Sequence, residues 1–277
     1  MMRLGRARLV GLLVTAGAVV AVVVAATASA VTKPRIVALH ITVNGLGTVR
    51  VPGNPAFTCH ASFPTSSHCR RTFYVRKGRR IVVRESPASG WKLWKWSGLA
   101  CHGSAATCAL RVKARRFGFV TASFVPPGDR LNPYSLGTPV PLDDPAGTGW
   151  RMTVNSATLN ANAQVEAVNG NVPPPAGQQY AVVNLSLTLL NGGPIQLKDF
   201  TMGRLLTYAH NHDYLTGECT SPSPDISAET VNSGQTATGN LCFVIFTTDA
   251  SKLLLSANDE VTTAYGVTAE THYFALH

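Results

Sequence analysis

Charged residues are scarce in this sequence of 277 residues, at 14% of the chain, and acidic residues are almost missing from one part of it. Residues 33–130 hold 17 Lys and Arg but only two Asp and Glu, whereas residues 131–277 hold four Lys and Arg and 12 Asp and Glu. A hydrophobic content of 45% with so few charges excludes general disorder. The opposite net charges of the two parts predict two domains with different surfaces.

Motifs of several enzyme classes are also missing. The sequence has no Gly-x-Ser-x-Gly elbow, no His-Glu-x-x-His pair and no phosphate-binding loop. Ser, His and Asp all occur, but their spacing in the sequence does not indicate a catalytic triad. We therefore predict a protein that is not an enzyme, has no cofactor and has no catalytic residue.

Long apolar runs are missing after residue 30, so no later segment could span a membrane. Before it, a basic start, an apolar run over residues 9–27 and the small pair Ala28 and Ala30 predict a secretory signal over residues 1–30. The run could alternatively remain as an uncleaved anchor, since a bilayer needs ~20 residues. In both cases the rest of the chain is predicted to be extracellular, either secreted or at the cell surface.

Six cysteines all lie in the exported part. An even number in an oxidising compartment predicts disulfides. The sequence does not fix the pairing, but the domain boundary limits the choice, and we predict three bonds: Cys59–Cys69, Cys101–Cys108 and Cys219–Cys242. The alternative is a zinc site, because His60, His68 and His102 adjoin three of these cysteines. Export and the lack of a Cys-x-x-Cys pair favour disulfides and no metal.

Short strand-like runs separated by turn residues fill residues 36–125. In residues 79–85, Ile81 and Val83 face one way, while Arg80, Val82 and Arg84 face the other, which is the period of a half-buried strand. Further strands are predicted at residues 36–43, 47–51, 72–78, 91–96, 108–112 and 117–125.

The same region carries motifs of a known family. Its order is Gly45-Leu46-Gly47-Thr48-Val49, then Trp96-Ser97-Gly98 before Cys101, then Val120-Thr121-Ala122-Ser123-Phe124. This order resembles the divergent internalin-type B-repeat (bacterial repeat) family of small β-grasp-like modules. The resemblance implies a spacer or adhesion module, usually without enzymatic activity. The single copy and its basic charge depart from the family pattern.

The basic residues cluster, and we predict that they form a cationic sheet face that binds anions. Trp91 and Trp94 interleave with them and would suit stacking on sugars or bases. The expected partners, reached through residues 70–116, are anionic cell-wall polymers, glycans or membrane surfaces, with nucleic acid less expected. The alternatives are a solvated basic surface or docking on the acidic domain. The predicted anion-binding residues are Arg79, Arg80, Arg84, Lys92, Lys95, Arg111, Lys113, Arg115 and Arg116.

Residues 126–149 are rich in Pro and lack apolar periodicity, which predicts a linker to a second domain at residues 150–277. About eight strands with turns between them predict an antiparallel β-sandwich there. Its strands are predicted at residues 150–159, 179–190, 195–202, 205–210, 236–248, 252–257, 260–267 and 271–277.

Two strands of the second domain show how it would pack. In residues 179–190, Val183 and Leu185 face inward and Asn184 faces outward, whereas residues 241–246 are apolar on both faces and are predicted to be a central strand. The step Gly234-x-Thr236-x-x-Gly239 before that strand looks like the immunoglobulin-like domain of unknown function 4352 family. That resemblance, over residues 137–277, implies an extracellular sandwich and no activity. The predicted fold class is therefore all-β, a small β-grasp-like module followed by an immunoglobulin-like sandwich.

The best metal candidate is His210-Asn211-His212-Asp213, which we interpret instead as a hairpin turn because Asn and Asp favour turns. Calcium sites at Asp143-Asp144 or in a turn at residues 258–260 are weaker candidates. The predicted function is a non-catalytic exported module for binding, adhesion or spacing. The alternative is an enzyme-associated or inhibitor-type protein whose site is built from loops.

Overall fold

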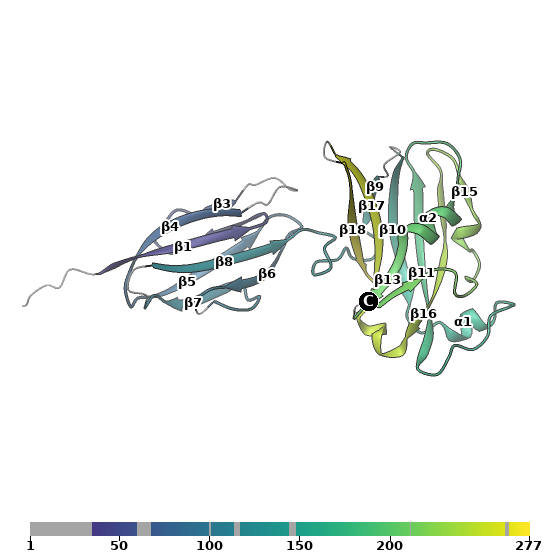
Figure 1. Cartoon of the computed structure of the whole chain (residues 1–277), viewed down its shortest axis with the longest axis horizontal. Helices are drawn as coiled ribbons and strands as arrows, with labels where there is room; N and C mark the ends of the chain where they lie inside the picture. Colours follow the sequence, from purple (N-terminus) through teal and green to yellow (C-terminus); the bar gives the residue numbers. More distant parts are fainter. Residues whose placement is uncertain are drawn as a thin grey trace, which may run out of the picture. The chain divides into compact units, whose positions relative to one another are not determined.

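The computed structural model describes residues 35–59, 68–99, 101–113, 117–143, 148–210, 212–263 and 266–277. As predicted, the fold is all-β, with mostly antiparallel sheets and two short α-helices in this part of the chain (Figure 1). The predicted signal or anchor over residues 1–30 lies outside the described residues. No helix within the described ranges combines the length and hydropathy needed to cross a membrane.

The first eight strands form a basic module of two four-stranded sheets, ordered β4-β1-β8-β6 and β3-β2-β5-β7 (Figure 1). The first and last strands, β1 and β8, are parallel neighbours, and every other pair is antiparallel. The strands are β1 (Ile36–Asn44), β2 (Gly47–Arg50), β3 (Phe57–Cys59), β4 (His68–Arg76), β5 (Arg80–Pro87), β6 (Lys92–Ser97), β7 (Thr107–Arg111) and β8 (Phe117–Val125).

Alternation along these strands builds the core of the basic module. Leu39 and Ile41 of β1 and Val83 of β5 are fully buried in one apolar cluster with Trp96. Gly47 allows a close approach here, because a Cβ atom at this position would lie 2.5 Å from the Phe124 ring. The alternation predicted for residues 79–85 is confirmed, since Ile81 and Val83 are buried and Arg80 and Arg84 are exposed.

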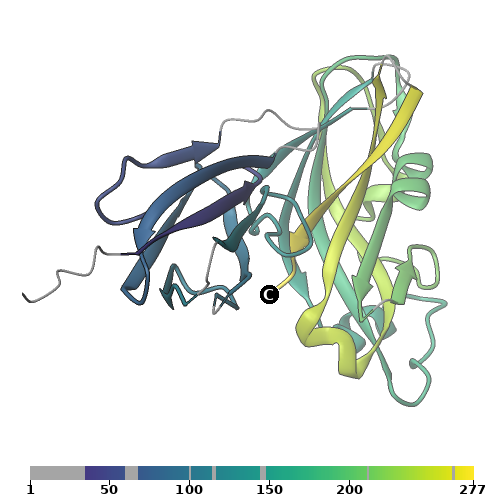
Figure 2. The same cartoon turned by 60° about the vertical axis from the view of Figure 1, so that its left-hand side comes forward.

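A β-sandwich follows, drawn from teal to yellow in Figure 2. Its sheets are ordered β16-β11-β10-β9 and β14-β13-β17-β18, with a ribbon of β12 and β15. Its strands are β9 (Pro139–Asp143), β10 (Gly149–Thr158), β11 (Gln178–Leu189), β12 (Ile195–Gln196), β13 (Leu205–Ala209), β14 (His212–Leu215), β15 (Thr230–Val231), β16 (Thr236–Phe246), β17 (Leu254–Thr263) and β18 (Gly266–Ala275). Its helices are α1 (Asn162–Glu166) and α2 (Leu197–Arg204), with 3-10 turns η1 (Ile226–Ala228) and η2 (Thr247–Lys252).

Side chains from both four-stranded sheets share the core of the sandwich. Leu185 of β11, Phe243 of β16 and Phe274 of β18 are fully buried in the same cluster. On the outer face of β11, polar side chains pair across strands, as in the hydrogen bond between Ser186 and Thr238 at 2.8 Å. The inward and outward pattern predicted for residues 179–190 is therefore confirmed.

Part of the predicted linker is a strand of the sandwich. β9 pairs with β10 at the edge of its sheet, opposite residues Gly149–Thr153. The prolines at 139 and 141 misled the prediction, because an edge strand tolerates residues that cannot donate to a ladder. Tyr134 also joins the sandwich, since its backbone bonds to Tyr273 and Ala275 at 2.8 Å.

Three predictions for the sandwich strands were wrong. Most of residues 195–202 is helix α2, because Leu197 and Phe200 are buried at a helical spacing of three. Strand β16 is not central but lies at one end of its sheet. Its second face is buried because Val165 of α1 and Cys242 pack there with Tyr180. Residues 258–260 lie inside β17 and do not form a turn.

Candidate functional site

Four arginines lie on the outer face of the sheet β3-β2-β5-β7, and we call them the arginine face: Arg50, Arg80, Arg84 and Arg111. The strand register places Arg50 directly opposite Arg84, and Arg80 directly opposite Arg111. All four are exposed. Like charges directly opposite one another destabilise a sheet, so this arrangement costs the fold free energy.

Two adjoining hollows open beside the arginine face. One of about 460 Å³ is lined by Arg76, Arg79 and Arg80 together with apolar side chains such as Val82. The second, of about 280 Å³, is lined by Arg50 and Arg84 and shares Val82 and the loop of residues 52–54 with the first. Guanidinium groups around a concave, partly apolar surface are suited to binding an anionic ligand.

Acidic side chains do little to balance these charges. No ion pair joins an arginine of this face to any carboxylate in the described part of the chain. Glu85 follows Arg84 in β5 but alternates to the inner face, opposite the buried Val49. Its Oε2 atom is buried without a hydrogen-bond partner, and burial raises the pKa of the Glu85 carboxyl. The arginine face therefore keeps its positive potential.

The structure divides the predicted anion-binding residues between two sheets, which corrects the single cationic face. Lys92 and Lys95 lie on β6, in the sheet β4-β1-β8-β6, away from the arginines of β5 and β7. Lys113 is exposed just after β7. Arg115 and Arg116 lie outside the described residues. Sequence reasoning missed Arg50, whose strand alternation alone could have placed it on an outer face.

Two of the predicted disulfides are present, Cys101–Cys108 and Cys219–Cys242, with Cα–Cα distances of 5.5 and 5.8 Å. Cys69 is disulfide-bonded as well. The Cys59 side chain lies outside the description, so its pairing with Cys69 stays a prediction. Because the sulfurs of Cys69, Cys101 and Cys108 are in disulfides, these cysteines are not zinc ligands.

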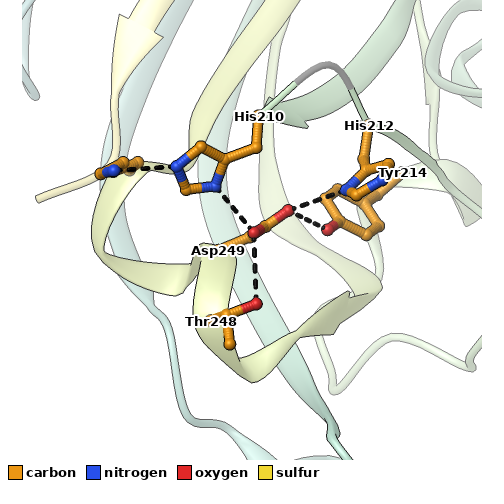
Figure 3. Close-up of polar contacts among 6 residues, drawn as sticks. His210, His212, Tyr214, Thr248 and Asp249 are labelled. Atoms are coloured by element: carbon orange, nitrogen blue, oxygen red, sulfur yellow. Dashed lines mark hydrogen bonds and ion pairs between the residues drawn. The ribbon is translucent and has the colours of Figure 1, made fainter.

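A second polar cluster lies in the sandwich, around the buried carboxylate of Asp249 in η2 (Figure 3). His210 Nδ1 donates to it at 2.8 Å, His212 Nδ1 at 3.1 Å and Tyr214 Oη at 2.6 Å. Lys252 Nζ lies 2.8 Å from the other ring nitrogen of His210. An ammonium can only donate, so His210 fits the tautomer that carries its proton on Nδ1.

These contacts decide the ionisation of Asp249. Burial alone would raise its pKa, but the hydrogen bonds from Tyr214, His210 and His212 outweigh burial and hold the pKa well below its ordinary value. Burial and the hydrogen bond to Asp249 raise the pKa of Tyr214 to about 12. The cluster therefore contains an ionised carboxylate and a neutral phenol at neutral pH.

The cluster links η2 to the hairpin of β13 and β14. The predicted turn is present, with Ala209 opposite His212 and His210 at a positive φ of 47°. The Nδ1 atoms of both histidines point at one carboxylate, which is the geometry of an internal hydrogen-bond network. Parts of the predicted metal sites lie outside the described residues. These parts are Asn211, Asp144 and the side chains of Asp143, Asp259 and Glu260.

No protein-family model matches the chain, and no curated protein matches it either. Among solved structures, it is similar to the secreted protein MPT63 of Mycobacterium tuberculosis, at 13% identity and a TM-score of 0.33 over 49% of this chain and 93% of that one. It is also similar to a putative lipoprotein of Bacillus subtilis, at 16% identity and a TM-score of 0.31 over 49% and 38% of the two chains.

A functionally unknown protein of Listeria monocytogenes is a third similar structure, at 10% identity and a TM-score of 0.33 over 50% of this chain and 82% of that one. At identities and scores this low, these likenesses carry no argument about function. The resemblances to the B-repeat and immunoglobulin-like families stay predictions.

Proposed function

We propose that this chain is an exported, non-catalytic binding protein whose arginine face contacts an anionic polymer such as a cell-wall polymer or an acidic glycan. The observation that carries the proposal is the direct pairing of Arg50 with Arg84 and of Arg80 with Arg111 on one exposed sheet face. This pairing costs stability, and a polyanion that lies across the face would remove that cost.

Two further observations support the proposal. The hollows beside Arg80 and Arg84 are concave pockets in which an anionic group can bind between guanidinium groups. The disulfides support an extracellular setting, because such bonds persist in oxidising compartments.

The test is the salt dependence of binding to immobilised teichoic acid and heparin. Each arginine that neutralises one anionic group is expected to contribute about one to the slope of log affinity against log salt. We expect the triple variant Arg80→Gln, Arg84→Gln, Arg111→Gln to lose most of its affinity at low salt and to show a slope lower by roughly three.

The matched control is Arg151→Gln, which removes an exposed arginine from the sandwich. Its slope should equal that of the wild type. The triple variant relieves repulsion, so loss of binding would not reflect unfolding. Equal binding at low and high salt, or an unchanged slope in the triple variant, would contradict the proposal.

A further inference from the structure

The outer face of the sheet β4-β1-β8-β6 exposes aromatic rings from three of its strands. Tyr74 of β4 is 72% exposed, Trp94 of β6 is 43% exposed and Phe119 of β8 is 43% exposed. The module has a full apolar core without them, because Trp96 and Phe124 fill the inner face. We call this surface the aromatic face, and within it the Phe119 ring stacks on His40, with ring centroids 5.0 Å apart.

A β-bulge turns Trp94 toward solvent. In the pairing of β6 with β8, Leu93 lies opposite Phe124 and Lys95 opposite Ser123, so that Trp94 is the extra residue. Leu93 stays buried on the inner face and Trp94 is released to the outer one. Bulges of this kind re-aim a side chain and are common beside binding sites.

A cation accompanies each of two rings. Lys95 Nζ lies 3.8 Å from the centroid of the Trp94 ring, and Arg70 Cζ lies 5.0 Å from that of Phe119. Neither cation forms an ion pair with a carboxylate of the described residues. Each pair thus places a positive charge over one face of an exposed ring, which fits a flat ligand unit that carries an acidic group.

Hydroxyl groups occupy the sheet between the two pairs. Thr121 of β8 lies opposite Thr42 of β1 on one side and opposite Ser97 of β6 on the other. All three are partly exposed. Such neutral hydroxyls suit the hydroxyls of a sugar chain better than the regularly spaced phosphates of a nucleic acid, which require a continuous row of cations.

We propose that the aromatic face binds an acidic polysaccharide, with sugar rings against Trp94 and Phe119 and the acidic groups on Lys95 and Arg70. This site goes beyond the proposed function, because it lies on a different sheet from the arginine face and adds apolar stacking to charge. Since salt does not screen stacking, part of this binding persists at high salt.

The test measures binding of a short oligogalacturonate to the full mature chain at high salt, with a neutral dextran oligosaccharide and oligo(dT) as comparison ligands. We expect Trp94→Ala to weaken oligogalacturonate binding about tenfold, with a similar loss for Phe119→Ala. The matched control is Arg151→Gln, which removes an exposed arginine from the sandwich and should leave high-salt binding unchanged. Trp94→Phe separately tests whether the ligand binds against Trp94. The change in tryptophan fluorescence that the wild type shows on adding ligand should be lost in this variant.

Unchanged affinity in Trp94→Ala would overturn the proposal, and so would a loss confined to oligo(dT), which would assign the face to single-stranded nucleic acid. A loss only for dextran would overturn the acidic ligand. The proposed function fails on a different result, namely an unchanged salt slope in the arginine variants, so the two failures are distinguishable.

Discussion

At the scale of the residue, Asp249 is a buried carboxylate that accepts hydrogen bonds from three side chains. Its side chain is only 5% exposed, while those of His210 and His212, which donate to it, are about half exposed. A buried charge is tolerated only when hydrogen bonds compensate for its lost hydration. The three donors from the hairpin β13–β14 supply that compensation and position η2.

We therefore expect Asp249→Asn to lower the free energy of unfolding of the sandwich at neutral pH by roughly 2 kcal/mol, because Tyr214 and the two histidines lose a charged acceptor. The lowered pKa of Asp249 also gives a pH dependence. Its stabilisation is present above the ordinary carboxyl pKa of ~3.9 and is lost as the pH falls below it. Denaturant unfolding between neutral and acidic pH measures both effects.

The control is Asp213→Asn, which changes an exposed carboxylate on the same hairpin. It should leave stability near that of the wild type. If the wild type and Asp249→Asn lost stability in parallel as the pH falls below ~4, the buried carboxylate would not be the titrating group.

At the scale of the element, the strands of the basic module place like charges opposite one another. In a sheet that needed only to fold, one member of each arginine pair would be expected to be neutral. The repulsion that lowers the stability of the sheet involves β5, because Arg80 and Arg84 each lie opposite another arginine. Repulsion of this kind is screened by salt, which makes it measurable.

Arg80→Thr is expected to raise the stability of the basic module by about 0.2–1 kcal/mol at low salt, while it weakens polyanion binding. The gain should shrink as salt is added. Arg79→Thr, which changes an exposed arginine just before β5, is the matched comparison and should bring a smaller gain. A loss of stability in Arg80→Thr at low salt would show that the paired arginines do not repel each other.

The two described disulfides close loops of different length, with sequence separations of 7 for Cys101–Cys108 and 23 for Cys219–Cys242. In the chain-entropy account, the longer loop contributes roughly 3 kcal/mol and the shorter roughly 2. We expect the double alanine variant of Cys219 and Cys242 to be the more destabilised of the two in thermal unfolding. A larger loss from the pair in the basic module would instead show that packing of the buried Cys101 dominates.

At the scale of the whole molecule, two separate apolar clusters account for most of the buried side chains. One draws on residues 37–124 and the other on residues 140–276. The segment between them bonds to both, since Asn132 Nδ2 donates to Gly90 O at 2.8 Å and Tyr134 pairs with Tyr273 and Ala275. A cluster of either size can support a domain of about 100 residues.

We expect the fragments 33–127 and 128–277 each to fold alone and to unfold cooperatively. Circular dichroism of each fragment during heating would check this, and the first fragment should retain the salt-dependent binding to heparin. If either fragment had no cooperative transition, the two clusters would form one folding unit.

Much of the secondary structure could be predicted from the sequence, because alternation in a strand is a local property. The buried Ile81 and Val83, the inward face of β11 and the hairpin at His210 all follow from neighbouring residues. Failures came where tertiary packing overrode local signals, as in helix α2 and in β9 with its prolines. Both elements are short, and β9 is an edge strand of its sheet.

The sequence by itself determined the all-β class, the expectation of disulfides and the separation of charge, because these depend on periodicity, cysteine number and composition. Only the tertiary structure decided which charges meet. Alternation assigns Arg80 to one of two faces, but strand order and register place Arg111 beside it and Lys95 on another sheet. Likewise, Asp249 lies 39 residues from His210, and only folding joins them. Contacts between distant segments depend on the packing of the whole chain, and no local pattern encodes them.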